Sequence, residues 1–216
     1  MVELVPVFPL PNAVLFPHTR LPLHVFEPRY RAMVRDATAG EGLIAVALLC
    51  PGFEEDYEGS PAYHPVGTVG RVEELERLPD GRFNLTLVGM ERVELQEIPS
   101  EKPYRIARAT RRPERVVDES APGLLEAKLD LMASQGYLLR ELAEASVPGI
   151  ILDERLPFET AVNGACANLP VEPHLRQELL ELDDPRDRRS RAAEMIEEVL
   201  EAVLKLKRDL RSQEMN

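Results

Sequence analysis

The sequence predicts an α+β fold in which a strand-rich first half carries one helix and the second half is helical. Apolar residues alternate or form short buried runs before residue 111, whereas after residue 124 they recur at helical spacing. The strand pattern ends over residues 111–122, where charge and proline content rise. We therefore expect a β-subdomain over residues 1–116 and an α-helical subdomain over residues 117–216, packed as one body.

Seven segments of the first half are typical of β-strands. They cover residues 4–8, 13–16, 21–26, 43–50, 66–78, 83–98 and 104–110. The fifth and sixth are joined by Pro-Asp-Gly-Arg at 79–82, which predicts a long hairpin. Prolines at 6, 9, 11, 17 and 22 lie within or beside the first three segments. Because proline cannot donate to a ladder, those strands must be short, bent or at an edge. The pattern fits a bent barrel or a sandwich.

Prolines also mark the expected helix starts. An early helix begins at Pro28 and stops at Gly40, and in the second half a helix covers residues 124–147, closed by Pro148-Gly149. Three further starts are expected at Pro157, Pro173 and Pro185. The last is the best marked, because Asp184 can supply the capping oxygen and Asp187 places negative charge near the positive helix end.

The final helix carries an apolar stripe with alternating four- and three-residue spacing. The stripe consists of Ala192, Ile196, Val199, Val203, Leu206 and Leu210, and it is widened by Leu200 and Leu204. This heptad is compatible with packing inside the helical bundle and with a homodimer seam. Packing within the chain is the default, because the other helices need a partner.

The composition is that of a globular protein. The chain has 216 residues, 44% of them hydrophobic, and a net charge of -12. Neither half has an excess of Lys and Arg, which disfavours general nucleic-acid binding. No apolar run approaches the roughly 20 residues that span a bilayer, and the start MVELVPVF does not look like a signal peptide. We expect a cytoplasmic protein whose two cysteines, Cys50 and Cys166, are buried apolar residues rather than a disulfide.

The sequence offers no catalytic, metal or cofactor motif. None of the four lysines follows a glycine, so the phosphate-binding loop of an ATPase is not expected. Ser100 and Lys102 lie close together between prolines, where a plain turn explains them better than a catalytic dyad. The four histidines are dispersed and no C-x-x-C occurs, so no metal site is predicted. We expect a protein that is not an enzyme.

Three blocks of sequence resemble the N-terminal substrate-binding domain of Lon proteases. The first is FPLPNAVLFPHTRLPLHVFEPRYRAMV at 8–34, and the second is VGTVGRVEELERLPDGRFNLTLVGMERVEL at 66–95, with its DGR turn and the G-x-x-R segment from Gly89 to Arg92. The third, at 157–188, includes the LP…Q-LLE stretch formed by Leu169, Pro170, Gln177, Leu179, Leu180 and Glu181. The blocks occur in the order of the family and cover nearly the whole chain.

The resemblance implies a PUA-like β-subdomain followed by a helical bundle that ends in a long helix. It also implies a role in protein quality control, with unfolded or hydrophobic polypeptide segments as partners and a protease or chaperone as a further partner. Because the sequence ends at Asn216, we expect a stand-alone module without the ATPase and protease parts.

Two segments are candidates for peptide binding. The loop at 51–64 carries Phe53, Tyr57 and Tyr63 among acids and glycines; aromatic residues in such loops form adaptable contact surfaces, although the loop can equally fold back over the barrel end.

The second candidate is the segment FEPRY at 26–30, where Glu27, Arg29 and Tyr30 can form a rim for a peptide. The structural alternative is favoured: Glu27 caps the helix, Phe26 and Tyr30 lock it onto the barrel, and Arg31 pairs with a carboxylate.

One basic cluster supports an alternative function. It consists of Arg105, Arg108, Arg111 and Arg112, followed by Arg115. PUA-like folds include RNA binders, so an RNA-binding module using this strip is the second hypothesis. A solvated strand edge is the favoured explanation, because only Tyr104 among the neighbouring residues could stack on a base.

Overall fold

The computed structural model describes residues 2–56, 59–143, 153 and 155–214. The chain forms two compact units. The first, here called the β-unit, comprises Met1–Pro113 and Glu172–Glu181, and the second, the helical unit, comprises Glu114–Val171 and Leu182–Asn216. A short segment from the helical half of the sequence thus groups with the strands. The expected division at residues 116 and 117 stays a prediction.

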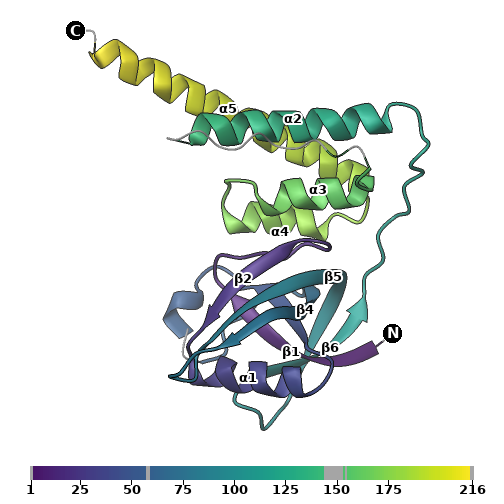
Figure 1. The fold of residues 1–216 in the computed structure, drawn as a ribbon, viewed down its shortest axis with the longest axis vertical. Coiled ribbons are helices and arrows are strands. Elements are labelled where there is room, and N and C mark those ends of the chain that lie inside the picture. Colours follow the sequence, from purple (N-terminus) through teal and green to yellow (C-terminus); the bar gives the residue numbers. More distant parts are fainter. Residues whose placement is uncertain (1, 57–58, 144–152, 154, 215–216) are drawn as a thin grey trace. The chain divides into compact units, whose positions relative to one another are not determined.

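The β-unit is a small barrel. Its strands are β1 (Val2–Leu10), β2 (Arg20–Val25), β3 (Leu43–Leu48), β4 (Val66–Arg77), β5 (Phe83–Ile98) and β6 (Arg105–Arg111). They are ordered β2-β5-β4-β3-β1-β6, and an additional β5–β6 pairing closes the ring (Figure 1). Only β1 and β3 are parallel. The predicted α+β class and the long β4–β5 hairpin are confirmed.

Prolines lie in this barrel where a strand has a neighbour on one side only. β1 pairs with β6 from Val2 to Val7 and with β3 from Val7 to Leu10. Pro6 and Pro9 therefore fall in halves of β1 that have a single described partner, where a missing N–H need not break a ladder. β2, which contains Pro22, pairs with β5 alone among the described strands.

The expected strand at residues 13–16 is wrong. This segment is irregular, although Leu15 and Phe16 are buried. It ends in a turn in which Thr19 N–H donates to the Phe16 carbonyl at 3.2 Å. The turn lies directly on Gly89, where a Cβ atom would come within 2.1 Å of the Phe16 oxygen. The apolar run is therefore explained by packing over a glycine rather than by strand pairing.

Helix α1 (Pro28–Ala39) covers the barrel and follows the sequence pattern. Pro28 begins it, Gly40 ends it, and Tyr30, Met33 and Val34 are buried. These three side chains join a cluster that includes residues of β1, β2, β3 and β5. A second cluster is formed by buried residues of β1, β3, β4, β5 and β6. The core thus fixes the first turn of α1 against the barrel.

Helix α4 (Pro173–Glu181) comes from the helical half of the sequence but belongs, like α1, to the β-unit. Gln177 Nε2 donates to the Val66 carbonyl at 2.9 Å. Arg92 Nη1 donates to the Leu180 carbonyl at 2.7 Å, and Arg112 Nη2 donates to the Glu181 carbonyl at 3.1 Å. The last carbonyls of a helix have no partner within the helix, so the two arginines complete the end of α4.

Arg92 is 1% exposed, which makes its removal costly. We expect Arg92→Met to lower the free energy of unfolding by about 3 kcal/mol, because a buried carbonyl loses a charged donor. Arg71 on β4 is an exposed arginine, and Arg71→Met should change stability by no more than about 0.5 kcal/mol. Urea unfolding followed by circular dichroism measures both; equal midpoints would show that Arg92 is dispensable.

The helical unit contains α2 (Leu124–Leu142), α3 (Phe158–Ala167) and α5 (Pro185–Glu214). The predicted starts at Pro157 and Pro185 are confirmed, because these residues are the N-cap of α3 and the first residue of α5. The predicted extent of α2 is wrong at Ala143, which has an extended backbone and caps the helix. Val147 and Pro148-Gly149 lie outside the described residues.

The apolar stripe of α5 is buried at its beginning and exposed toward its end. Ala192 and Ile196 are fully buried, whereas Leu206 and Leu210 are 60% and 51% exposed. Packing within the chain therefore accounts for the first part of the stripe. A homodimer seam stays a prediction.

A second buried arginine joins the parts of the helical unit. Arg188 is 0% exposed, and its Nη1 donates to Asn163 Oδ1 on α3 at 2.6 Å. Its Nη2 donates to the Leu182 carbonyl at 2.6 Å and pairs with Glu114 at 2.7 Å. The Arg188 side chain thus connects α5, α3 and Glu114, where the chain enters the helical unit.

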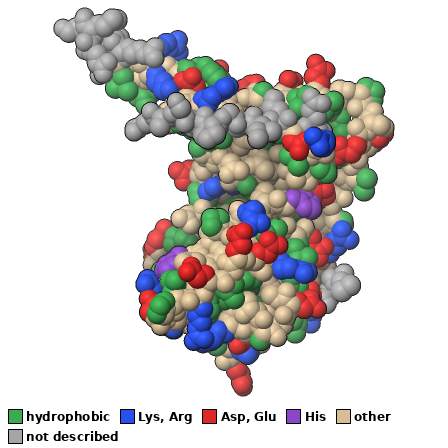
Figure 2. All heavy atoms as spheres, in the orientation of Figure 1, with side chains coloured by type: hydrophobic (Ala, Val, Ile, Leu, Met, Phe, Trp, Pro, Cys, Tyr) green, Lys and Arg blue, Asp and Glu red, His purple; other side chains and the backbone are tan. Residues whose placement is uncertain are grey.

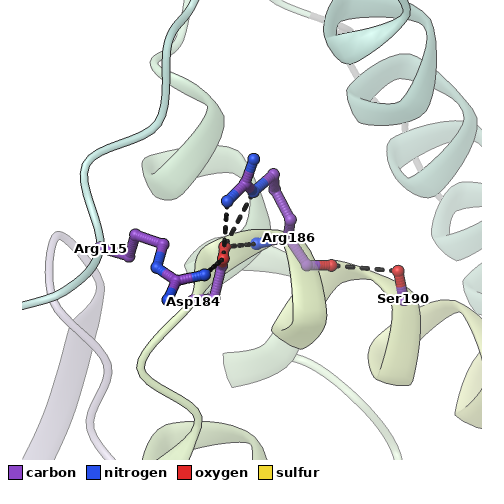
Figure 3. A network of polar contacts seen from close by, with 4 residues as sticks. All are labelled: Arg115, Asp184, Arg186 and Ser190. Carbon is purple, nitrogen blue, oxygen red and sulfur yellow. Dashed lines mark hydrogen bonds and ion pairs between the residues drawn. The ribbon is translucent and has the colours of Figure 1, made fainter.

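Asp184 caps α5 as its position predicted (Figure 3). Its Oδ1 accepts from the Arg186 N–H at 2.9 Å, and its Oδ2 pairs with Arg186 at 2.8 Å and with Arg115 at 3.2 Å. Ser190 Oγ donates to the Arg186 carbonyl at 3.0 Å. Hydrogen bonds from the Arg186 side chain lower the pKa of Asp184 most, and the Arg186 N–H and Arg115 lower it further.

Asp184 should stabilise the fold in a pH-dependent way. Asp184→Ala is expected to cost about 1–2 kcal/mol at pH 7 through the lost cap, whereas Asp184→Asn keeps a capping oxygen and should cost less. Because folding lowers the pKa of Asp184, its negative charge contributes fully to the free energy of unfolding above about pH 5. This contribution fades as the pH falls below about 4.

The measurement is urea unfolding at neutral and acidic pH, with Asp187→Asn, an exposed neighbour in the first turn, as control. A difference between wild type and Asp184→Asn that does not shrink in acid would contradict the assigned role.

Candidate functional site

A cavity of about 200 Å³ opens in the β-unit. It lies where the first turn of α1, the segment at 59–61, the end of β5 and the start of β6 converge. Its wall is formed by Pro9, Arg29, Tyr30, Leu49, Gly59, Ser60, Pro61, Glu97, Ile98, Pro99, Ser100, Lys102, Pro103, Tyr104, Arg105 and Ile106. Part of this wall is the loop that the sequence singled out.

Two tyrosines contribute to the wall and are held in place by the core. Tyr30 packs on Phe8 with ring centroids 4.5 Å apart, and the Arg29 guanidinium lies 4.7 Å from the Tyr30 centroid. The Tyr104 hydroxyl donates to Asp36 Oδ2 at 2.7 Å. Burial, and then the hydrogen bond to Asp36, raise the pKa of Tyr104, so its phenol stays protonated at neutral pH. Both rings are therefore fixed surfaces.

Three cations also contribute to the wall, and each has a carboxylate partner. Arg29 Nε lies 3.0 Å from Glu27 and Lys102 Nζ lies 2.7 Å from Asp36, whereas Arg105 is paired with Glu97 through two nitrogens. The hydrogen bonds from Lys102 and Tyr104 lower the pKa of Asp36, so this carboxylate remains charged. The cations are thus oriented by ion pairs before any ligand arrives.

Arg105 also secures the loop at 51–64. Its Nη1 donates to the Pro61 carbonyl at 2.6 Å, and its guanidinium lies 4.2 Å from the centroid of Tyr63. Burial raises the pKa of Tyr63 to about 12. The C-terminal part of this loop therefore folds back on the barrel. This was one of the two alternatives that the sequence left open for the loop.

The candidate peptide-binding residues are brought together only in part. Tyr30 contributes to the cavity wall, Glu27 orients Arg29, and Tyr63 packs under Arg105. Phe53 is half-buried in the short 3-10 helix η1 (Phe53–Asp56). Tyr57 lies outside the described residues. Their role in binding stays a prediction.

Two structural expectations for the segment at 26–30 are wrong. Glu27 occupies the N-cap of α1 but makes no side-chain capping bond, because its carboxylate pairs with Arg29 instead. Phe26 is 59% exposed and stacks on His24 with centroids 6.3 Å apart, so it does not lock the helix. Of the two aromatic residues, Tyr30 is the one that packs in the core, together with Met33 and Val34 of the same helix.

The sequence did not predict that Lys102 and Tyr104 share a cavity with Tyr30. The turn between β5 and β6 brings them to the first turn of α1, which is remote in sequence. The prolines at 99 and 103 predict only a plain turn. The signal that could have been used was the pairing of β5 with β6, which places the connecting turn at the barrel end.

The arginine cluster is largely occupied by partners of its own. Arg111 pairs with Glu91 at 2.9 Å, Arg112 donates to the carbonyl of Glu181, and Arg105 is paired with Glu97. Arg108 is exposed. Since phosphate binding needs cations that are not already neutralised, this arrangement weighs against the RNA-binding hypothesis.

In the described part of the chain, no group of three His, Cys, Asp or Glu residues is placed to hold a metal ion, and no helix is long and apolar enough to cross a membrane. Cys50 and Cys166 are free thiols. Burial raises the pKa of Cys166 to about 12, which leaves its thiol protonated and unreactive at neutral pH.

Solved structures share this fold. The N-terminal domain of Mycobacterium avium complex Lon protease matches 90% of this chain and 98% of its own length, with a TM-score of 0.66 and 18% identity. A Lon N-terminal domain protein from Xanthomonas campestris matches 86% of this chain and 94% of its own, with a TM-score of 0.60 and 26% identity. The fold is that of Lon N-terminal domains.

The family model of the ATP-dependent protease La (LON) substrate-binding domain matches residues 4–198. The chain belongs to this family, as the three sequence blocks indicated. The Lon protease of Anaeromyxobacter dehalogenans is 30% identical over 202 residues, covering 93% of this chain and 24% of that protein. Lon protease 2 of Sorangium cellulosum is 30% identical, with 96% and 26% covered. The chain thus spans about a quarter of the length of these relatives.

Arg105 and Arg108 offer a matched pair on β6. Arg105→Lys should loosen the loop, because lysine cannot bind Glu97 and the Pro61 carbonyl through one planar fork. We expect a several-fold faster cleavage within residues 51–64 by a Glu-specific protease, measured by mass spectrometry. Arg108→Lys should leave the rate unchanged. Equal rates for both variants would show that Arg105 does not hold the loop.

Proposed function

We propose that these 216 residues form a polypeptide-binding module that selects unfolded or hydrophobic segments and performs no chemistry on them. One observation carries the proposal: the substrate-binding domain model of the family matches residues 4–198. The whole-length relatives are named as proteases, and it is the matching domain that the family description calls substrate-binding.

The cavity suits such a role. Its aromatic and aliphatic wall offers apolar area that is already ordered, which reduces the entropy cost of binding. Its polar groups can receive the backbone of an extended segment, since a peptide brings carbonyls and N–H groups to any surface that it covers. We infer that this cavity, rather than the arginine cluster, is the contact region.

The surface charge favours selectivity for exposed apolar segments. Figure 2 shows acidic and basic side chains interspersed with hydrophobic ones on the face in view. On this face the two signs are mixed, so no extended patch of one sign is available to attract a charged partner. Binding would then depend on short-range apolar contact.

We further propose a cytoplasmic setting in which a protease or chaperone accepts the captured polypeptide. Two free thiols are compatible with a reducing compartment. Because the module is proposed to be non-catalytic, the partner would perform any cleavage or refolding.

The test compares two forms of one model protein, native and permanently unfolded by reduction and carboxymethylation. Fluorescence anisotropy should show at least about tenfold tighter binding of the unfolded form, because only that form exposes its apolar side chains. Both forms should stay intact on prolonged incubation, with ATP and without it. Equal affinities would contradict selectivity for unfolded segments, and cleavage of the unfolded form would contradict a non-catalytic module.

A further inference from the structure

We propose that an extended polypeptide segment adds as a further strand along the free edge of β2 and is bound mainly through its backbone. The inference rests on the proposed polypeptide-binding function and specifies how a polypeptide is held. β2 stands at the end of the strand order and pairs with β5 alone among the described strands. This edge is a contact region in addition to the cavity.

The hydrogen bonds at the start of β2 show which residues of β5 face it. The Gly89 N–H donates to the Thr19 carbonyl at 2.9 Å, and the Gly89 carbonyl accepts from the His18 N–H at 2.8 Å. Gly89 therefore faces β2. Because the backbone groups of successive residues point to opposite sides of a strand, Leu87 and Leu85 face β2 as well.

The pairing of β4 leads to the same alternation independently. The Val72 N–H donates at 2.8 Å to the carbonyl of Gly42, which directly precedes β3. Its neighbour Arg71 therefore faces β5, where the register places it opposite Val88. Since Val88 faces β4, Leu87 is left to face β2.

The outward-facing groups of β2 follow from this alternation. The register places Leu21 and Leu23 of β2 opposite these two leucines of β5. The alternate residues Arg20, Pro22 and His24 therefore direct their backbone groups to the open edge. All three are exposed, and none of the turn and loop hydrogen bonds between described residues ends on their backbone. The edge thus offers two N–H donors and three carbonyl acceptors to an added strand.

Pro22 argues against a second copy of this chain as the occupant. If two β2 strands overlapped fully in an antiparallel pair, the two prolines would meet at its centre with no N–H on either side. A segment of another polypeptide can still donate its own N–H to the Pro22 carbonyl and loses only one bond. The proline therefore protects the edge against self-pairing and leaves it open to other chains.

The side chains at this edge suit an apolar segment without a charge requirement. Phe26 directly follows β2, is 59% exposed and stacks on His24. An added strand can place an apolar side chain on this face, where cross-strand neighbours contact each other. Arg20 is paired with Glu73 and Glu74. Recognition through the backbone depends little on sequence, and native proteins have few unpaired backbone groups to offer.

The experiment uses the full chain and a labelled decapeptide of alternating Thr and Val, and it compares two substitutions of one residue. His24→Ala removes the side chain and keeps the N–H, whereas His24→Pro removes the N–H as well. Because this N–H faces away from β5, the β2–β5 ladder should persist in both. Anisotropy should show the His24→Pro variant binding the peptide about fivefold more weakly than His24→Ala, since one backbone hydrogen bond is lost.

A substitution with the opposite effect covers the case in which His24→Pro does not fold. Pro22→Val supplies the missing donor at the centre of the edge and should tighten peptide binding about fivefold. Phe26→Ala should weaken binding through lost apolar contact, whereas Met90→Ala, which shortens an exposed side chain on β5, should leave it unchanged.

Amide hydrogen exchange followed by NMR locates the bound strand directly. Peptide binding should slow exchange at the N–H groups of Arg20 and His24 several-fold. The N–H groups of Leu21 and Leu23 already face β5, so their exchange should change little.

Three outcomes would overturn the inference: unchanged exchange at Arg20 and His24 with saturating peptide, equal affinities of the two His24 variants, or weaker binding by Pro22→Val. Dimerisation of the unmodified chain through these amides would overturn the choice of occupant. If unfolded protein is still preferred over native protein, the proposed function survives these failures. If neither unfolded protein nor the peptide binds, both proposals fail.

Discussion

The architecture of the β-unit depends on burying the C-terminal end of a short helix. The last carbonyls of α4 point toward strands, where water cannot satisfy them, and an unpaired buried carbonyl costs about 1–3 kcal/mol. Arg92 from β5 and Arg112 beyond β6 provide the missing donors, and their charge also suits the negative end of the helix. A helix from a remote part of the sequence is thereby held against the barrel.

The same device recurs in the helical unit, where fully buried Arg188 joins α3, α5 and Glu114. Buried guanidinium groups are tolerated because five N–H donors can each find an oxygen. This use of arginine explains why a basic cluster read from sequence need not be a nucleic-acid surface. Arg105 already binds the Pro61 carbonyl of the loop, and Arg112 already binds the Glu181 carbonyl at the end of α4.

Local signals in the sequence predicted most of the fold, whereas contacts between remote segments escaped it. The turn at Gly81, the starts at Pro28 and Pro185, and the cap at Asp184 each depend on a few adjacent residues. By contrast, the buried run at 13–16 packs over Gly89, and Glu27 prefers Arg29 to the helix end. The cavity was not foreseen because its wall comes from several separated segments. Of the candidate residues, Arg29, Tyr30 and Arg105 belong to the wall, whereas Glu27, Phe53 and Tyr63 do not.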